Sequence, residues 1–204
     1  KLFVIMIKAI VFDIGGVILD AHALIEDLQK WFKPKDNLIF WEELNLKLAP
    51  LCKGEGTLHK TMTEFAKEKN IKIPDSVLKE LFLIEKKHLK FNNGVIELIK
   101  SLKENYRLGI ISNTIEEHAI ELRKLELFEY FELVILSHEI KMSKHELDIF
   151  QHLIKEMDLK PNEIVFIDDV QKYADNASSI GIHGICYKNI DQLKIDLVNL
   201  GLNV

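Results

Sequence analysis

The sequence predicts an α/β protein with a Rossmann-like parallel sheet and an all-helical domain inserted after the first strand. Three observations predict it. An apolar run over 7–12 is too short for a helix and is typical of a buried strand. A long region without strand patterns follows it, and from Gly94 onward short apolar strands alternate with amphipathic helices. This alternation indicates a parallel sheet covered by helices on both faces.

The alternating part has its elements in a regular order. Helices are expected over 94–105, 114–128, 146–158, 172–181 and 190–200. Strands are expected over 106–112, 131–137, 163–168 and 183–187. Apolar residues three and four positions apart indicate the helices, and short continuous apolar runs indicate the strands.

The region between the first strand and Gly94 contains four helical patterns, over 23–32, 37–51, 57–69 and 74–90. Thr57 is a suitable N-cap for the third helix, and Pro74 opens the fourth. We therefore expect residues 21–90 to form a helical domain and residues 1–20 and 91–204 to form the sheet-bearing core.

Composition and charge narrow the class of protein. The 204 residues are 48% hydrophobic, which suits one or two soluble domains. The net charge of −5 argues against a nucleic-acid-binding surface, and no apolar run reaches the length of a membrane span. Cys52 and Cys186 stand in no metal or redox spacing, which fits the cytoplasm. Residues 1–5, before Met6, are typical of an extension.

Polar residues follow the strands at the carboxyl edge of the sheet, where ligands bind in open α/β folds. They are Asp13 after the first strand, Ser112, Asn113 and Thr114 after the second, Lys144 after the third, and Asp168 and Asp169 after the fourth. Taken singly, each is more simply a cap, a turn residue or a solvated side chain. Their occurrence together, in order along one sheet, indicates a site.

These residue types suit phosphoryl transfer. The Asp13 carboxylate can attack phosphorus and hold the group as an aspartyl phosphate. Because substrate and carboxylate repel each other, we expect Mg²⁺ to bridge them, with Asp168 and Asp169 completing its site. Ser112 can hold phosphoryl oxygens, and Lys144 offers them a positive charge. A receiver domain uses similar residues, but its acid pair follows the first strand, so the order of the motifs excludes it.

The motifs resemble those of the haloacid dehalogenase-like (HAD) phosphohydrolase superfamily along nearly the whole chain. In order they read FDIGGV, ISNT, SHEIKMSKHELDIF and FIDDVQKYADNASSIGI. The helical region between the first two is similar to the family's type-1 cap. FDxG members that resemble sugar-phosphate phosphatases exist in this superfamily. The resemblance implies a Rossmann-like core and Mg²⁺-dependent phosphatase chemistry.

The resemblance also implies roles for the matching residues. Asp13 would be the catalytic nucleophile, and Lys144 would steady Asp13 and the phosphoryl group. The phosphoryl group would be bound by Ser112, Asn113 and Gly16. Mg²⁺ would be held by Asp13, the backbone carbonyl of Gly15 and Asp169, with Asp168 one step further out.

One departure from the family pattern affects the leaving group. Most of its phosphatases have a second Asp two residues after the nucleophile, as general acid, where this chain has Gly15. General acid catalysis is worth roughly 10²–10⁴ in rate. Its loss matters least for good leaving groups, such as those of anomeric sugar, acyl or aryl phosphates. Asp20 and His145 are candidates to supply the proton instead, and a structural or solvated role is the alternative for each.

Two further departures concern the lysine and the metal site. His145 replaces the Pro that usually follows the lysine, which predicts a less rigid Lys144. Tyr173 stands where Asn or Asp is usual, which predicts a weaker metal site. Asp175 and Asn176 lie nearby but out of register.

The helical region gives weaker indications of the substrate. KGEGTLHK (53–60) resembles a cap loop that faces the active site, with Glu55 and His59 as candidate substrate contacts, and an ordinary turn is the alternative. Gly54 and Gly56 would let this loop bend. The aromatic residues at 31, 32, 40 and 41 either line a pocket or, as their spacing favours, form the core of the helical region.

We therefore expect a cytoplasmic, Mg²⁺-dependent phosphatase that hydrolyses a small phosphate monoester, with sugar phosphates among the candidates, through an Asp13 aspartyl phosphate. The expected partner is a small phosphorylated metabolite, without nucleic acid or membrane, and the chain would be a monomer or homodimer. The alternative, favoured by Gly15, His145 and Tyr173, is a weakly active or non-catalytic protein of the same fold with a binding or regulatory role. Dehalogenase activity is disfavoured because haloacid dehalogenases of the superfamily need no metal.

Overall fold

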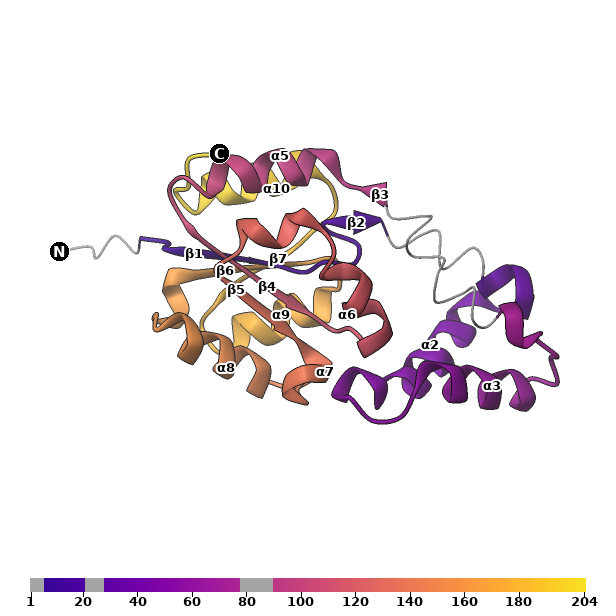
Figure 1. The fold of residues 1–204 in the computed structure, drawn as a ribbon. Helices are drawn as coiled ribbons and strands as arrows, with labels where there is room; N and C mark the ends of the chain where they lie inside the picture. The colour runs from indigo at the N-terminus through magenta and orange to yellow at the C-terminus, as the bar shows by residue number, and fades with distance from the viewer. Residues whose placement is uncertain (1–5, 21–27, 78–89) are drawn as a thin grey trace.

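A five-stranded parallel sheet forms the centre of the computed structural model, which describes residues 6–20, 28–77 and 90–204 (Figure 1). Its strand order is β5-β4-β1-β6-β7. The strands are β1 (Ala9–Phe12), β4 (Arg107–Ser112), β5 (Leu133–Leu136), β6 (Ile164–Asp168) and β7 (His183–Cys186). Phe12 at the end of β1 lies opposite Ile110 of β4 and Ile167 of β6, so β1 is the central strand. The predicted fold class is confirmed.

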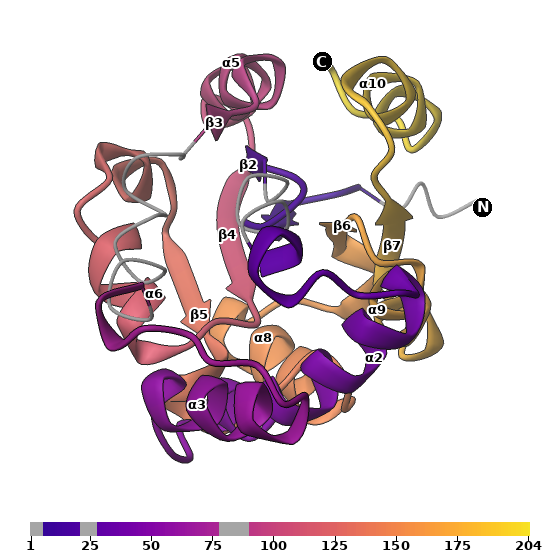
Figure 2. The ribbon, with the colours of Figure 1, turned by 90° about the vertical axis from the view of Figure 1, so that its right-hand side faces the viewer.

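Helices cover both faces of the sheet, α5 and α10 on one and α8 and α9 on the other (Figures 1 and 2). The helices of this part are α5 (Asn93–Leu102), α6 (Glu116–Leu122), α7 (Ser137–Ile140), α8 (Asp148–Met157), α9 (Gln171–Ser179) and α10 (Ile190–Asn199). Along β1, Ile10 and Phe12 join the core beneath α5 and α10, whereas Ala9 and Val11 join the core beneath α8 and α9. This two-residue alternation is the pleat of a strand buried on both faces.

Two segments of this part differ from the prediction. The pattern over 114–128 forms α6 and then a separate 3₁₀ turn, η2 (Glu126–Tyr130), instead of one helix. The short helix α7 begins at Ser137, where a strand was expected to end. A further 3₁₀ turn, η3 (Pro161–Glu163), precedes β6.

The helical insertion, the name used here for residues 21–90, has α2 (Asn37–Leu48), the 3₁₀ turn η1 (Leu51–Lys53) and α3 (Leu58–Glu68). Thr57 caps α3 as predicted, because its hydroxyl accepts a hydrogen bond from the Lys60 N–H at 3.4 Å. Residues 28–32 and 75–77 are also helical, and the rest of the helices predicted over 23–32 and 74–90 lies outside the described residues.

Aromatic side chains form the core of the helical insertion. Phe32, Phe40 and Phe65 are buried, with ring centroids 5.2–5.7 Å apart, and Trp41 packs edge-on against Phe40. Trp31 is 37% exposed. The expectation that these aromatic residues form a core is therefore confirmed for Phe32, Phe40 and Trp41, but not for Trp31, which lies outside that core.

A two-stranded antiparallel ribbon joins the two ends of the helical insertion, with Leu19–Asp20 (β2) paired to Lys90–Phe91 (β3). Two-residue strands have no hydrophobic period, so the sequence did not predict them. The ribbon lies where the domain boundaries were expected, and the division at 20/21 and 90/91 stays a prediction.

The helical insertion packs on the core at the carboxyl edge of the sheet (Figures 1 and 2). Its turn η1 contacts α7 closely: Gly54 has a φ of 72°, and a Cβ there would lie 2.7 Å from the backbone oxygen of His138. The Leu58 N–H at the start of α3 donates to Glu117 Oε1 of α6 at 3.1 Å. Within the described residues, no helix combines the length and apolar character needed to cross a membrane.

Candidate active site

Asp13 directly follows β1 and is 6% exposed. Its N–H donates to the Ile167 carbonyl at 2.8 Å, so the strand pairing with β6 continues up to the carboxylate. The chain then turns sharply: the Gly16 N–H donates to the Leu19 carbonyl at 2.7 Å, with φ of 76° at Gly16. A residue with a side chain rarely adopts that φ, which explains the glycine.

Lys144, in the loop between α7 and α8, is 1% exposed and fixed along its whole length. Its Nζ lies 2.8 Å from Asp13 Oδ1 and 2.6 Å from Asp168 Oδ2. Its N–H donates to Asn113 Oδ1 at 2.9 Å, and its carbonyl accepts from Asn176 Nδ2 at 2.9 Å. Two asparagines thus hold the backbone of Lys144 where the family usually has a proline after the lysine, and a less rigid lysine stays a prediction.

Three carboxylates form an acidic cluster: Asp13, Asp168 and Asp169 each offer an oxygen, and these oxygens lie within 4.8 Å of one another. Asp168 is fully buried and accepts from the Val170 N–H at 2.9 Å, whereas Asp169 is exposed. Oxygen ligands in this number, with one side open, fit Mg²⁺, which binds through one or two carboxylates plus water or substrate oxygens.

The electrostatics of the acidic cluster favour a cation. The pKa of Asp13 is raised to about 7, mainly by burial; the Lys144 ammonium opposes this rise, and the charges of Asp168 and Asp169 add to it. Burial alone would lower the pKa of Lys144, but Asp13 and Asp168 outweigh it and raise that pKa, so the ammonium stays charged. A divalent cation would relieve the repulsion among the carboxylates and keep Asp13 ionised.

Ser112 ends β4 beside Asp13's strand and is 4% exposed. The next residue, Asn113, uses its side-chain oxygen to hold Lys144. The Thr114 N–H donates to Ser137 Oγ at 3.0 Å, which fixes this turn to α7. Residues 112–114 therefore help to position Lys144, in addition to placing Ser112 beside Asp13.

The side chains that depart from the family pattern form a pair. Tyr173 Oη lies 2.9 Å from His145 Nε2, and the two rings meet edge to face. Lys144 Nζ lies 5.0 Å from the centre of the Tyr173 ring, a cation–π contact. Asp20, the other candidate proton donor, is exposed on β2 opposite Lys90.

A pocket of about 350 Å³ lies between the helical insertion and the core. It borders the acidic cluster, because its lining includes Val170, whose N–H donates to Asp168 Oδ1 at 2.9 Å, and Tyr173, whose ring centre lies 5.0 Å from Lys144 Nζ. Glu55 and His59 are absent from its described lining: Glu55 is exposed, and His59 Nε2 lies 2.9 Å from Asp75 Oδ1. The structure does not place these two residues in this pocket, and their contact with substrate stays a prediction.

Sequence reasoning missed several residues of the pocket lining, among them Cys52, Leu58 and His118. Cys52 directly precedes the segment 53–60 that the sequence singled out, and Leu58 lies within it, so the segment was identified but its pocket-lining side chains were not. His118 lies on α6, and it reaches the pocket because the helical insertion packs against that helix.

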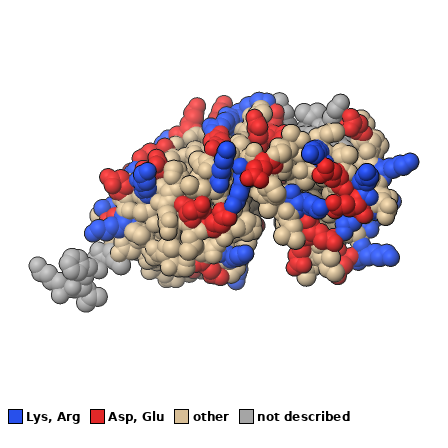
Figure 3. Space-filling view, turned by 90° about the horizontal axis from the view of Figure 1, so that it is seen from below, with Lys and Arg blue, Asp and Glu red and all other residues tan. Residues whose placement is uncertain are grey.

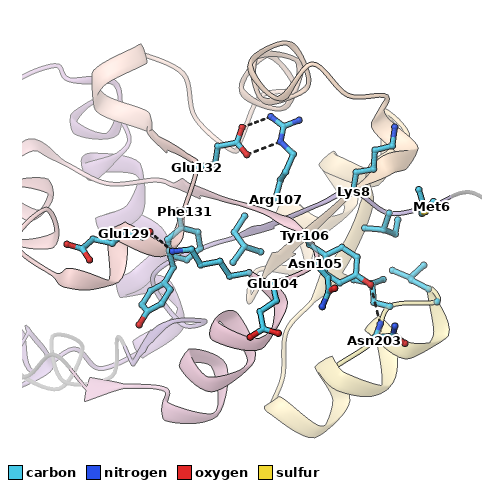
Figure 4. A pocket seen from close by; sticks show the side chains of 17 residues that line it. Met6, Lys8, Glu104, Asn105, Tyr106, Arg107, Glu129, Phe131, Glu132 and Asn203 are labelled. Carbon is cyan, nitrogen blue, oxygen red and sulfur yellow. Dashed lines mark hydrogen bonds and ion pairs between the residues drawn. The ribbon is translucent and has the colours of Figure 1, made fainter.

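A second hollow, of about 970 Å³, lies at the opposite end of the sheet (Figure 4). Charged side chains of its lining are hydrogen-bonded to other lining residues: Arg107 makes two hydrogen bonds to Glu132, and Lys103 donates to the Glu129 carbonyl. The acidic cluster is far from it. On the face seen in Figure 3, basic and acidic side chains are intermixed.

The fold and the site define a class of α/β hydrolases that carry an acidic cluster and a buried lysine at the carboxyl edge of a parallel sheet. Within that class, the chain belongs to the haloacid dehalogenase-like hydrolases, because the model of that family matches residues 10–186. The family predicted from the sequence motifs is confirmed.

Individual relatives align along most of the chain. A phosphorylated carbohydrates phosphatase of Thermotoga maritima is 23% identical over 87% of this chain and 83% of its own. A sesquiterpene phosphatase of Aspergillus oryzae is 23% identical over 87% of this chain and 88% of its own. A HAD family enzyme of Bacteroides thetaiotaomicron, solved with magnesium and inorganic phosphate, is 26% identical, with a TM-score of 0.70 over 89% of this chain and 94% of its own.

Proposed function

We propose that this protein is an Mg²⁺-dependent phosphatase that hydrolyses a small phosphate monoester through an aspartyl phosphate on Asp13. One observation carries the proposal: the buried Lys144 ammonium lies 2.8 Å from Asp13 and 2.6 Å from Asp168, at the carboxyl edge of the sheet. A positive charge fixed there is suited to neutralise charge on a phosphoryl group and to orient the attacking carboxylate.

The acidic cluster is the proposed metal site. Asp13 and Asp169 would hold Mg²⁺ together with the backbone carbonyl of Gly15, and Asp168 would support them from its buried position. When bound, Mg²⁺ would neutralise the phosphate and allow it to approach the carboxylates. The Bacteroides thetaiotaomicron enzyme crystallised with magnesium and phosphate supports this choice of ion.

The proposed reaction has two steps. The Asp13 carboxylate attacks phosphorus, the bond to the ester oxygen breaks, and that oxygen takes a proton, for which His145 in the pocket lining is the candidate donor. Water then attacks the aspartyl phosphate, which releases inorganic phosphate and restores the carboxylate. Ser112, Asn113 and the backbone at Gly16 would bind phosphoryl oxygens, and Lys144 would hold Asp13 in line throughout.

The chemistry of the site specifies a phosphate monoester but does not specify the leaving group. The names of the two relatives differ in the leaving group, one a carbohydrate and one a terpene. A sugar phosphate, the narrower expectation from the sequence, is supported by the first of them alone. A cytoplasmic setting is part of the proposal and is supported by the two free cysteines, Cys52 and Cys186.

The test is phosphate release from p-nitrophenyl phosphate and a panel of sugar, acyl and nucleotide phosphates. Wild type with Mg²⁺ is compared with wild type in EDTA and with Asp13→Asn. Turnover that requires metal and is lost in Asp13→Asn is the expected result. A folded protein that binds Mg²⁺ but releases no phosphate from any substrate would contradict the proposal and favour a non-catalytic role.

A further inference from the structure

The pocket beside the acidic cluster has an apolar wall. Leu44, Leu48, Leu58 and Met62 face it from the helical insertion. Ile115 and Val170 face it from the core, and Val170 follows the acid pair directly yet is 41% exposed. An apolar side chain that remains exposed next to a catalytic centre is available to contact a ligand.

Charged side chains are absent from the described lining, which contains no Lys, Arg, Asp or Glu. A substrate with a second phosphate or a carboxylate would therefore bury that charge without a partner, which is costly. The lining includes two histidines. Burial lowers the pKa of His118 to about 4, so its imidazole is neutral near pH 7, and burial together with the charge of Lys172 also lowers the pKa of His145.

The polar groups of the lining are largely engaged within the protein. Asn113 Oδ1 accepts from the Lys144 N–H, and Tyr173 Oη bonds to His145 Nε2. Asn45 is exposed on α2. A sugar brings several hydroxyl groups that each need a partner once they are removed from water. This wall of leucine, methionine and isoleucine side chains offers few hydrogen-bond partners, so it favours a ligand that buries apolar surface.

We propose that the phosphate monoester hydrolysed here has an apolar, uncharged leaving group, such as an alkyl, isoprenoid or aryl alcohol, which binds in this pocket. At about 30 Å³ for each water-sized group, 350 Å³ holds roughly ten to fifteen non-hydrogen atoms. This inference rests on the proposed function, since it identifies the substrate class of the same site.

The test uses n-alkyl phosphates from ethyl to octyl, whose leaving groups have nearly the same acidity and differ in apolar surface. We expect kcat/KM to rise about threefold to fourfold per buried methylene until the pocket is full. Glucose 6-phosphate should react no faster than ethyl phosphate. A flat series, or a preference for glucose 6-phosphate in an enzyme that hydrolyses p-nitrophenyl phosphate, would overturn the apolar substrate class and leave the phosphatase proposal intact.

Two variants on one helix provide a matched control. Leu48→Gln puts an amide into the pocket wall. It should lower kcat/KM for octyl phosphate at least about tenfold and change kcat/KM for ethyl phosphate less than about threefold, so that the rise with chain length becomes smaller. Leu46→Gln changes a residue of the same helix that is 76% exposed and absent from the lining, and should retain the wild-type series. Equal behaviour of the two variants would count against the pocket.

Binding separates this inference from failure of the phosphatase proposal. The stable analogues n-alkylphosphonates are titrated into the Asp13→Asn protein with Mg²⁺, and the dissociation constant is measured by calorimetry. Affinity that increases from ethyl to octylphosphonate and loses this increase in Leu48→Gln supports the apolar site even if turnover is absent. Affinity independent of chain length overturns it.

Discussion

Gly16 and Asp169 are in direct contact: a Cβ added to Gly16 would lie 2.1 Å from Asp169 Oδ2. Gly16 also has a φ of 76°, which residues with a side chain rarely adopt. The turn after β1 thus determines where the exposed acid of the cluster can lie. The neighbouring Gly15 is different, because a Cβ there would meet no atom within 4 Å.

Gly16→Ala is therefore expected to displace the Asp169 carboxylate and to weaken Mg²⁺ binding and turnover by at least about tenfold. Gly15→Ala is the matched control, since it keeps the backbone carbonyl and meets no obstacle, and it should bind Mg²⁺ nearly as well as wild type. Calorimetric titration with Mg²⁺ measures both. Equal loss in the two variants would mean that the turn as a whole, and not the contact with Asp169, controls the metal.

Lys144→Met should destabilise the metal-free protein by about 3–5 kcal/mol, because it leaves Asp13 and Asp168 buried without their positive partner. Urea unfolding in EDTA measures this, with Lys155→Met on the exposed face of α8 as a control expected to stay within about 0.5 kcal/mol. Adding Asp13→Asn to Lys144→Met should recover part of the loss, because one of the uncompensated charges is removed. A fully additive double variant would contradict the coupling.

The pH dependence of stability should carry a contribution from His118. Burial lowers its folded pKa from 6.5 to about 4, and the nearby Glu117 opposes this only in part. Between pH 6.5 and 4 the unfolded chain therefore binds a proton that the folded chain does not, and stability falls as the pH falls. His118→Gln should remove a loss on the order of 2 kcal/mol across this window, measured by urea unfolding at pH 7 and pH 4.5. An unchanged difference between the two pH values would show that His118 is protonated in the folded protein.

We expect His145, and not Asp20, to donate the proton to the leaving group. His145 is hydrogen-bonded to Tyr173 and faces the pocket, whereas Asp20 is exposed on the ribbon β2–β3. We expect His145→Ala to lower kcat/KM at least about tenfold for alkyl phosphates and to affect p-nitrophenyl phosphate much less, because a nitrophenolate leaves without a proton. Asp20→Asn should retain both activities. A similar loss on both substrates in His145→Ala would indicate that the histidine supports the loop of Lys144 instead.

The sequence predicted which residues meet at the site better than it predicted the residues that hold them in place. Asp13, Ser112 and the acid pair could be placed because each stands at the end of a strand with a strong apolar pattern, and parallel strands end at one edge. Lys144 could be placed because it lies in the segment that follows the third strand of the sheet along the chain, before α8. Asn176 could not be assigned to Lys144, because it is helix packing between α9 and the loop before α8 that brings its amide to the Lys144 carbonyl. The pocket lining was missed for the same reason, since it is determined by how the helical insertion packs on the core, whereas the β2–β3 ribbon was missed because its two-residue strands have no hydrophobic period.

Gly15→Asp tests the missing general acid directly. The space beside Gly15 admits a side chain, and a carboxyl group there would lie two residues after Asp13, the proposed nucleophile, where most phosphatases of the family have it. We expect kcat for alkyl phosphates to rise at least about tenfold, within the roughly 10²–10⁴ that a general acid supplies, with little change for p-nitrophenyl phosphate. Gly15→Asn, equal in size without the acid, should show no gain. If His145 supplies the proton in wild type, His145→Ala should cost far less activity in the Gly15→Asp background, because the new carboxyl group then donates to the same oxygen. A full loss on top of Gly15→Asp would instead assign His145 to holding Lys144 and Tyr173 in place.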